Sequence, residues 1–340
     1  MVTPAADDER RLRLAFVGCG AIAEWHLAAL RAAAPRTTVT AAIDVDGDRA
    51  LAMAKETGAE PFASLDEALA AGTFDAVLIM VPHHRHEELA VAALRAGKHV
   101  LLEKPMAPTV AACQRIMDVA RGSDVMFLVA ENAQYWPEVV LTRDLIDDGA
   151  VGEVITARAW HCATPMEQFH GPGHWRMSVA EAGGGVAIDA GSHWLRPLRM
   201  WLGELVEVVA TTGRPLAAME GESMCRALCR FESGVVASFD VVMSPGPAAP
   251  LPLFQVTGSG GELVIDGLGR VKLYDGSDPR GTVVGQGGYL QSYEGQMAAF
   301  EAAVLDGVAP PAGAESSLGE LRGALAMYRS ASSGRWEAVW

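Results

Sequence analysis

Apolar stretches alternate with helical segments through the N-terminal part of the chain. Each stretch is apolar at nearly every position, as expected of strands that are covered on both faces. The segments between them carry apolar residues at helical spacing, and one ends at Gly97, a residue type common at helix C-termini. Strands that alternate with helices in this way predict a doubly wound parallel sheet. Its predicted strands are residues 12–17, 39–44, 61–62, 74–81, 99–102 and 125–130.

The pattern changes after residue 204, where short segments alternate apolar and polar residues between turn signals. Hairpin turns are predicted at residues 232–234 and 258–261, so the neighbouring strands should run antiparallel. Residues 235–242 carry apolar side chains on both faces, which favours a partner subunit on one of them, in a homodimer or homotetramer. In the second half of the chain as a whole, the predicted strands are 153–162, 206–211, 224–231, 235–242, 253–258, 262–265 and 271–274, and helices are predicted near 137–148, 291–305 and 317–332.

A glycine turn follows the first predicted strand and precedes a predicted helix. Gly18 suits the tight turn, and Gly20 has no Cβ to keep the backbone away from a pyrophosphate. Ala23 is small enough for close packing of helix on strand, and the helix N-terminus offers free N–H groups to phosphates. Asp44 ends the second strand, where a carboxylate accepts hydrogen bonds from the ribose hydroxyls of NAD and repels the 2′-phosphate of NADP. The segment therefore predicts NAD as the cofactor, with NADP disfavoured.

Charge and composition narrow the possible partners. The chain has 340 residues, with 27 basic and 42 acidic side chains and a net charge of −15, which argues against nucleic acid or an anionic membrane as partner. No apolar run reaches the length of a membrane span. The five cysteines form no C-x-x-C pair, so we expect neither a zinc site nor a disulfide framework, and we expect a reduced, cytoplasmic protein.

Two further predicted strands end in polar residues. Glu103 and Lys104 directly follow one of them, and the next residue is a proline that stops the strand and fixes the direction of the lysine. The other is followed by His83, His84 and His86, which could form a metal site, but no acidic or cysteine partner lies at a familiar spacing. We therefore expect no metal there, and assign these histidines to loop packing or to contacts with cofactor or substrate.

A candidate acid–base pair lies in the second half. If the segment after the glycines at 183–185 is helical, Asp189 and His193 lie four residues apart on one face, where the carboxylate would orient the imidazole as a general base. An incidental pair with a buried histidine is the alternative. The irregular loop 164–182 is rich in Pro, Gly, His and Trp, and it is either a binding loop or an ordinary surface loop.

Several of these segments resemble one protein family. The run from Ala93 to Ala107, which includes Glu103-Lys104-Pro105, is similar to the signature of the glucose–fructose oxidoreductase, inositol dehydrogenase and MocA (Gfo/Idh/MocA) family. The glycine turn with His26, the Pro82-x-x-x-His86 segment and the D-x-G-x-H motif from Asp189 to His193 resemble it too. The resemblance implies an N-terminal Rossmann domain, 1–131, and a C-terminal α/β domain, 132–340, built on a large open mixed, mainly antiparallel sheet.

The resemblance also implies the location of the site. It makes Lys104, Asp189 and His193 the catalytic residues. The residues implied to contact NAD are Gly18, Gly20, Ala21, Ile22, Asp44, Val81, His83, His86, Glu103, Lys104 and Asn132. The residues implied to contact substrate, besides the catalytic three, are Tyr135, Trp136, His161, His174, Trp175 and Arg176. The sequence departs from the family pattern at Gln134, where an arginine is common, and at Arg196, where an acid is common.

Together these features indicate an NAD-dependent oxidoreductase acting on a hydroxyl or carbonyl of a sugar, inositol or related polyol. In this reading, His193 takes the hydroxyl proton and Lys104 stabilises the developing negative charge on the same oxygen. One alternative is a glycosidase that uses bound NAD transiently. Another is a catalytically silent sensor of NAD or sugar, although a sensor has no need of a base.

Overall fold

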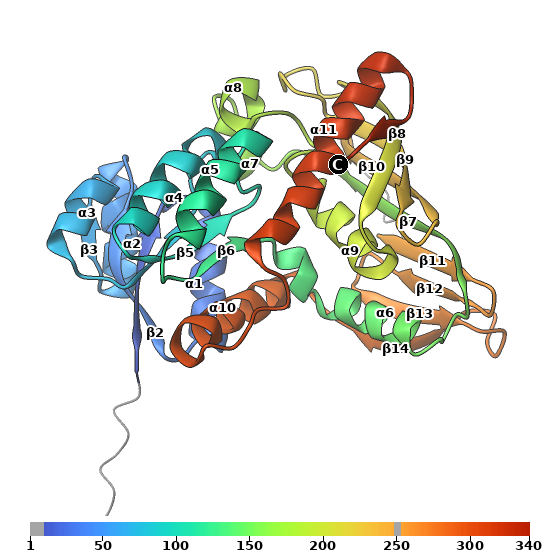
Figure 1. Ribbon diagram of the computed structural model, residues 1–340, viewed down its shortest axis with the longest axis horizontal. Helices are drawn as coiled ribbons and strands as arrows, with labels where there is room; N and C mark the ends of the chain where they lie inside the picture. Colours follow the sequence, from blue (N-terminus) through green and yellow to red (C-terminus); the bar gives the residue numbers. More distant parts are fainter. Residues whose placement is uncertain (1–9, 248–252) are drawn as a thin grey trace, which may run out of the picture.

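The computed structural model describes residues 10–247 and 253–340, which form two sheets with helices packed around them (Figure 1). The end of the Pro/Ala-rich stretch at 244–252 and the first nine residues lie outside the described residues. Among the described helices, none has the length and apolar character needed to cross a bilayer.

The N-terminal sheet has six parallel strands in the order β3-β2-β1-β4-β5-β6, so the predicted doubly wound sheet is confirmed. The strand order reverses beside β1, and ligands in such sheets bind beyond the carboxyl ends of the strands at this point. The strands are β1 (Leu12–Val17), β2 (Thr37–Ile43), β3 (Glu60–Phe62), β4 (Ala76–Ile79), β5 (His99–Glu103) and β6 (Phe127–Ala130); the helices are α1 (Ala21–Ala33), α2 (Gly47–Thr57), α3 (Leu65–Ala71), α4 (His86–Arg95) and α5 (Val110–Arg121).

The second sheet has nine strands in the order β14-β13-β12-β11-β7-β10-β9-β8-β15. Its central pair, β7 and β10, is parallel and its other pairs are antiparallel, which confirms a mixed, mainly antiparallel sheet. The strands are β7 (Val154–Ala163), β8 (Leu205–Gly213), β9 (Met224–Phe231), β10 (Val236–Met243), β11 (Phe254–Gly258), β12 (Glu262–Ile265), β13 (Arg270–Tyr274), β14 (Thr282–Gln286) and β15 (Glu337–Ala338). The sequence pattern did not predict β14 or β15.

Helices cover one face of this sheet. These are α6 (Pro137–Asp147), α9 (Ser192–Leu202) and α11 (Leu318–Ser333). Alternate residues of β10, such as Phe239 and Val241, are buried beneath them, whereas Ser238 and Asp240 on the opposite face are half-buried. In the described part of the chain, the second face of the sheet therefore carries no helical layer.

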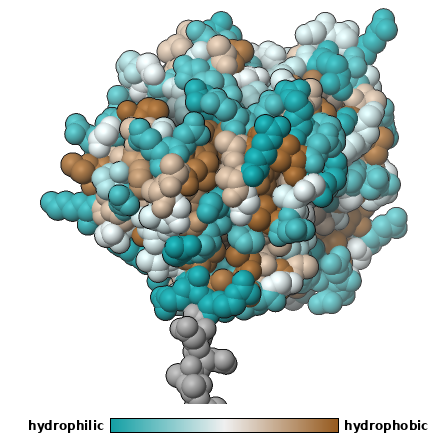
Figure 2. All heavy atoms as spheres, turned by 60° about the vertical axis from the view of Figure 1, so that its left-hand side comes forward, coloured by the Kyte–Doolittle hydropathy of each residue, from teal (hydrophilic) through white to brown (hydrophobic). Residues whose placement is uncertain are grey.

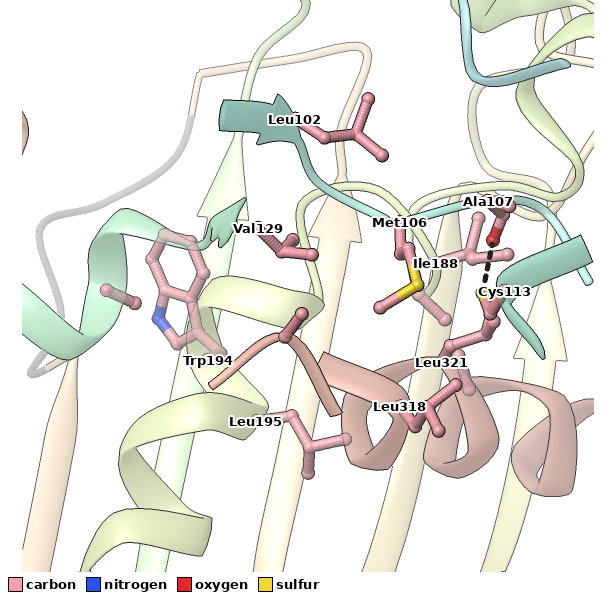
Figure 3. Packing of buried hydrophobic residues seen from close by; sticks show 14 of the residues in the cluster. Leu102, Met106, Ala107, Cys113, Val129, Ile188, Trp194, Leu195, Leu318 and Leu321 are labelled. Atoms are coloured by element: carbon pink, nitrogen blue, oxygen red, sulfur yellow. Dashed lines mark hydrogen bonds between the residues drawn. The ribbon is translucent and has the colours of Figure 1, made fainter. Parts of the chain in front are cut away.

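A single buried cluster joins the two sheets. Leu102 and Val129 from the ends of β5 and β6 belong to the same core as Ile188, Leu195 and, on α11, Leu318 (Figure 3). Close packing of this kind fixes the position of one half of the molecule against the other. The carboxyl ends of the N-terminal strands are thereby held against the start of α9.

Helix α10 (Tyr289–Asp306) crosses back to the N-terminal half and packs on α1 (Figure 1). Its buried residues Tyr293, Met297 and Phe300 share a core with the helix and strands of that half. The outer surface of the N-terminal half shows hydrophilic and hydrophobic residues interspersed (Figure 2). The division of the chain after residue 131 stays a prediction, because α10 belongs by packing to the first half and by sequence to the second.

Candidate active site

A cavity of about 1620 Å³ lies where the N-terminal strands end. Its wall combines residues from both halves of the chain and includes most of residues 164–176, so the irregular loop lies at the cavity, as a binding loop would. The predicted site residues that line it are Gly18, Gly20, Ala21, Ile22, Asp44, Val81, His83, Glu103, Lys104, His161, His174, Trp175, Arg176, Asp189 and His193.

The glycine turn fits a dinucleotide. Gly18 has a left-handed φ of +94°, and a Cβ there would lie 2.4 Å from the carbonyl oxygen of Met80, so only glycine suits the position. A Cβ at Gly20 would meet nothing within 4 Å, which leaves open space for a ligand beside the backbone. Gly20 also has no side chain to cap α1. The N–H of Ala23 donates to the carbonyl of Gly20 at 3.0 Å, and the N–H groups of Ala21 and Ile22 remain available to phosphate oxygens.

Asp44 is held at the rim of the cavity by backbone donors. Its two carboxylate oxygens accept hydrogen bonds from the N–H groups of Cys19 and Asp46, both at 2.8 Å. Each oxygen keeps further acceptor capacity. A fixed carboxylate beyond the second strand suits the ribose hydroxyls of NAD.

Lys104 is buried and is paired with Asp189. Its Nζ donates to the carboxylate Oδ1 at 2.8 Å and to the backbone carbonyl of the same residue at 2.9 Å. Arg176 Nε donates to the other carboxylate oxygen at 2.9 Å. Burial opposes ionisation of Asp189, but the two cations outweigh it and hold the pKa of this carboxyl well below its usual range. One of the three N–H donors of Lys104 remains for a substrate oxygen.

His193 is paired with Glu131, which directly follows β6. Its Nδ1 lies 2.6 Å from Glu131 Oε1. Burial works to raise the pKa of Glu131, but the charge and the hydrogen bond of His193 lower this pKa to about 2. An ionised carboxylate can only accept, so Nδ1 carries the proton of the neutral imidazole and Nε2 is its basic nitrogen.

The predicted pairing of Asp189 with His193 is wrong. Helix α9 begins at Ser192, so Asp189 precedes the helix instead of sharing a face with the histidine. The chain between them makes a tight turn, in which the N–H of Gly191 donates to the carbonyl of Val186 at 2.8 Å. The turn is so close that a Cβ at Gly191 would lie 2.3 Å from the carbonyl oxygen of Ala187. The turn directs Asp189 to Lys104 and leaves the imidazole to Glu131.

Three other histidines of the cavity wall, His83, His161 and His174, are neutral near pH 7. Burial lowers the pKa of His161 to about 4, and burial is also the main cause that lowers the pKa of His174 to about 4. The pKa of His83 lies well below its ordinary value for the same reason, and its Nδ1 donates to the carbonyl of Ala182 at 2.8 Å. The wall therefore offers imidazole groups without positive charge.

Four of the predicted site residues lie away from the cavity. His86 is fully buried, with its ring nitrogens 2.9 and 3.0 Å from the backbone carbonyls of Pro105 and Val81. Asn132 donates to Ser292 at 2.7 Å, and so ties the end of the first half to α10. The other two, Tyr135 and Trp136, pack against residues of the second half, Gly295 and Trp194 among them.

The histidine cluster at 83–86 forms no metal site in the part of the chain that the structure describes. His83 and His86 are buried and bonded to separate backbone carbonyls, and His84 is exposed. Of the two departures from the family pattern, Arg196 is buried away from the cavity and donates to Glu320 at 3.0 Å. Gln134 is buried and does not line the cavity either. Neither residue lines the cavity, although the charge of Arg196 contributes to the lowered pKa of Glu131.

Sequence reasoning did not assign Glu131 to the site. A signal was nevertheless present, since this carboxylate directly follows a buried parallel strand, as Asp44 and Lys104 do. Phe169 and Tyr289 line the cavity and were not assigned to the site either, and they carried no comparable signal.

Comparison with known proteins agrees with this geometry. A family model described as an oxidoreductase family with an NAD-binding Rossmann fold matches residues 12–131, and one for the GFO/IDH/MocA C-terminal domain matches 139–264. The 1,5-anhydro-D-fructose reductase of Ensifer adhaerens is 30% identical over 95% of this chain and 97% of its own length.

Solved structures share the whole fold. A levoglucosan dehydrogenase in complex with NADH and levoglucosan has a TM-score of 0.86 at 20% identity, covering 97% of this chain and 99% of its own. GenD2 from gentamicin A biosynthesis, in complex with NAD, has a TM-score of 0.83 at 27% identity and covers 99% of both chains. The predicted family, fold class and NAD cofactor are thus confirmed: the chain belongs to the Gfo/Idh/MocA family and is an NAD-binding oxidoreductase.

Proposed function

We propose that the protein interconverts a hydroxyl and a carbonyl group on a sugar or related polyol. The observation that carries this proposal is that a lysine with a free N–H and a histidine with a free ring nitrogen line one cavity from opposite halves of the chain. The names of the relatives support the substrate class, since they describe a reductase of 1,5-anhydro-D-fructose and dehydrogenases of levoglucosan and inositol.

Lys104 and His193 are the acid–base groups of the proposed reaction. In the oxidation direction, His193 Nε2 accepts the proton of the substrate hydroxyl, and the free N–H of Lys104 stabilises negative charge on the oxygen. Asp189 keeps the ammonium group in place through two hydrogen bonds. In reduction, the same two residues supply the proton and polarise the carbonyl. Bound NAD supplies the acceptor or donor of hydride.

The remaining wall suits a ligand with many neutral hydroxyls. His161 and His174 are uncharged hydrogen-bonding groups, and Trp175 and Phe169 provide apolar surface beside them. Arg176 lies over both of these aromatic rings, at 4.2 and 5.3 Å from their centroids. Apolar walls with a few fixed polar groups are typical of small-molecule sites.

An absorbance screen with NAD and with NADP over inositols, aldoses, anhydrosugars and glycosides tests this function. NADH should form with at least one neutral sugar or polyol, and NADP should be the poorer cofactor because of Asp44. Product release from a glycoside without net NADH would instead indicate redox-neutral turnover. No turnover with any compound, together with tight NAD binding, would favour a sensor.

We also propose a homo-oligomer, a dimer or a tetramer, that pairs through the uncovered face of the second sheet. On this face the guanidinium groups of Arg158 and Arg226 lie 5.1 and 5.6 Å from the ring centroid of Trp160. Leu228, on the same face, is 46% exposed. All five cysteines are free thiols, which supports a reducing compartment and hence a cytoplasmic location.

A further inference from the structure

We propose that Glu131 is the positioning residue of the catalytic base: it holds His193 in the tautomer that leaves Nε2 free to take the substrate proton. This inference rests on the proposed function, in which His193 is that base. It concerns a carboxylate that the family resemblance did not bring into the site.

The hydrogen bond between the two residues is short and buried. Glu131 is 1% exposed and His193 is 7% exposed, so water competes little for their 2.6 Å contact. The backbone N–H of Ala133 donates to the same carboxylate oxygen at 3.1 Å and restrains the carboxylate. The carboxylate therefore has a fixed position from which it orients the ring.

The charge of Glu131 sets its role. Burial alone would favour the neutral acid, but the pKa of the carboxyl is lowered to about 2 by His193 and, more weakly, by Arg196 and Lys104. Glu131 thus stays ionised while His193 Nε2 gains the proton that the substrate O–H bond releases. It stabilises the imidazolium and does not itself become protonated, which is the role of the aspartate in a Ser-His-Asp triad.

Among the described residues, no other carboxylate is hydrogen-bonded to His193. Asp189, the expected partner, already accepts hydrogen bonds from Lys104 and Arg176. Each acid–base group thus has a carboxylate of its own, and each pair joins the two halves of the chain. Lys104 in the first half pairs with Asp189 in the second, and Glu131 in the first half pairs with His193 in the second.

The test replaces Glu131 in the full-length enzyme by glutamine and by aspartate. Glutamine is nearly isosteric, but its amide can donate to Nδ1 and so favour the wrong tautomer. We expect Glu131→Gln to lower kcat by roughly 10²–10⁴-fold with KM and NAD affinity little changed. Glu131→Asp keeps the charge and should recover part of the loss.

Nitrogen-15 NMR of the cofactor-free protein gives a readout that does not depend on turnover. In the unchanged protein the His193 signals should show a protonated Nδ1 and an unprotonated Nε2, and Glu131→Gln should remove this preference. Glu138→Gln is the matched control, since Glu138 is also a buried carboxylate outside the cavity wall, but it is not the hydrogen-bond partner of His193. It should leave kcat and the tautomer of His193 unchanged.

The outcomes separate this inference from the proposed function. Normal kcat and an unchanged His193 tautomer in Glu131→Gln, with His193→Ala inactive, would overturn the role of Glu131 and leave the base in place. Normal turnover in His193→Ala would instead remove the base itself. Loss of NAD binding or of folding in Glu131→Gln, with Glu131→Asp no better, would show that the residue is structural.

Discussion

At the scale of single residues, the glycine turn separates what the fold needs from what the cofactor needs. Gly18 is required by the protein itself, because its backbone conformation and its contact with Met80 exclude a side chain. Gly20 is surrounded by open space, so the protein alone does not explain the lack of a side chain there. The sequence motif identified both glycines, but only the structure shows that Gly18 is required by the backbone and that Gly20 leaves space for a ligand.

Alanine substitutions should therefore have opposite effects at the two positions. Gly18→Ala should destabilise the fold by about 1–3 kcal/mol or more, because it introduces both backbone strain and a clash. Gly20→Ala should leave the free energy of unfolding nearly unchanged and weaken NAD binding, since its methyl group occupies ligand space. Urea unfolding and calorimetric titration with NAD measure the two effects. Equal stability losses in both variants would contradict this assignment.

Asp189 makes a pH-dependent contribution to stability. Its pKa in the folded state is lower than in the unfolded state, so its pairing stabilises the fold above the usual carboxyl range and this contribution is lost as the pH falls. Asp189→Asn leaves Lys104 and Arg176 without their counter-charge, which should cost about 3–5 kcal/mol near pH 7. When unfolding is measured from pH 7 to pH 3, the difference in the free energy of unfolding between the unchanged protein and Asp189→Asn should become smaller as the pH falls. A difference in the free energy of unfolding that stays constant over this pH range would contradict the pH-dependent contribution of Asp189.

At the scale of elements, helix α10 completes the core of the N-terminal half. Phe300 on this helix is 1% exposed and packs in the core with residues of α1 and β1, although it follows them by more than half the chain. The same helix is tied to the start of β2, where the hydroxyl of Thr37 donates to Glu301 at 2.7 Å. The N-terminal half thus depends on a segment that lies near the end of the sequence.

Truncation of Phe300 tests this dependence. Phe300→Ala should lower the free energy of unfolding by about 3–5 kcal/mol through lost burial and a cavity. Leu290 on the same helix is 57% exposed, so Leu290→Ala should change it by less than about 0.5 kcal/mol. Thermal or urea unfolding compares the two variants. A small loss for Phe300→Ala would show that α10 is only loosely attached.

The elements differ in how well sequence predicts them. Strands β4 and β5 are covered on both faces, so their continuous apolar runs identified them, and the polar residues after them located one edge of the site. Strands β14 and β15 are short and β14 is largely exposed, so they left no apolar pattern. The start of α9 was misjudged because helical spacing alone does not reveal the tight turn that precedes Ser192.

At the scale of the whole molecule, the site exists only where the two halves meet. The motifs predicted Lys104 and His193 as catalytic, but which carboxylate pairs with each depends on how the halves dock. The shared core that includes Leu102 and Leu195 sets that docking, and no local spacing encodes it. Sequence therefore indicated the reacting groups more readily than their partners.

The uncovered sheet face should hold the oligomer together. Leu228→Glu places a charge on that face and should convert the oligomer to monomers. Leu51→Glu is the control, at a residue of α2 that is 60% exposed, and it should leave the oligomer intact. Light scattering at micromolar concentration measures the mass of each. If the unchanged protein is itself a monomer, the proposed interface does not exist.

The most direct test of the account is a double-mutant cycle on kcat/KM with Lys104→Ala and His193→Ala. Because both residues are proposed to act on one substrate oxygen, each single change should lower kcat/KM by roughly a hundredfold or more, with NAD affinity retained. The double variant should lose far less than the product of the two single losses, since residues that act as a unit are not additive. Near-normal turnover in either single variant, with the fold intact, would contradict the shared role of these residues at the junction.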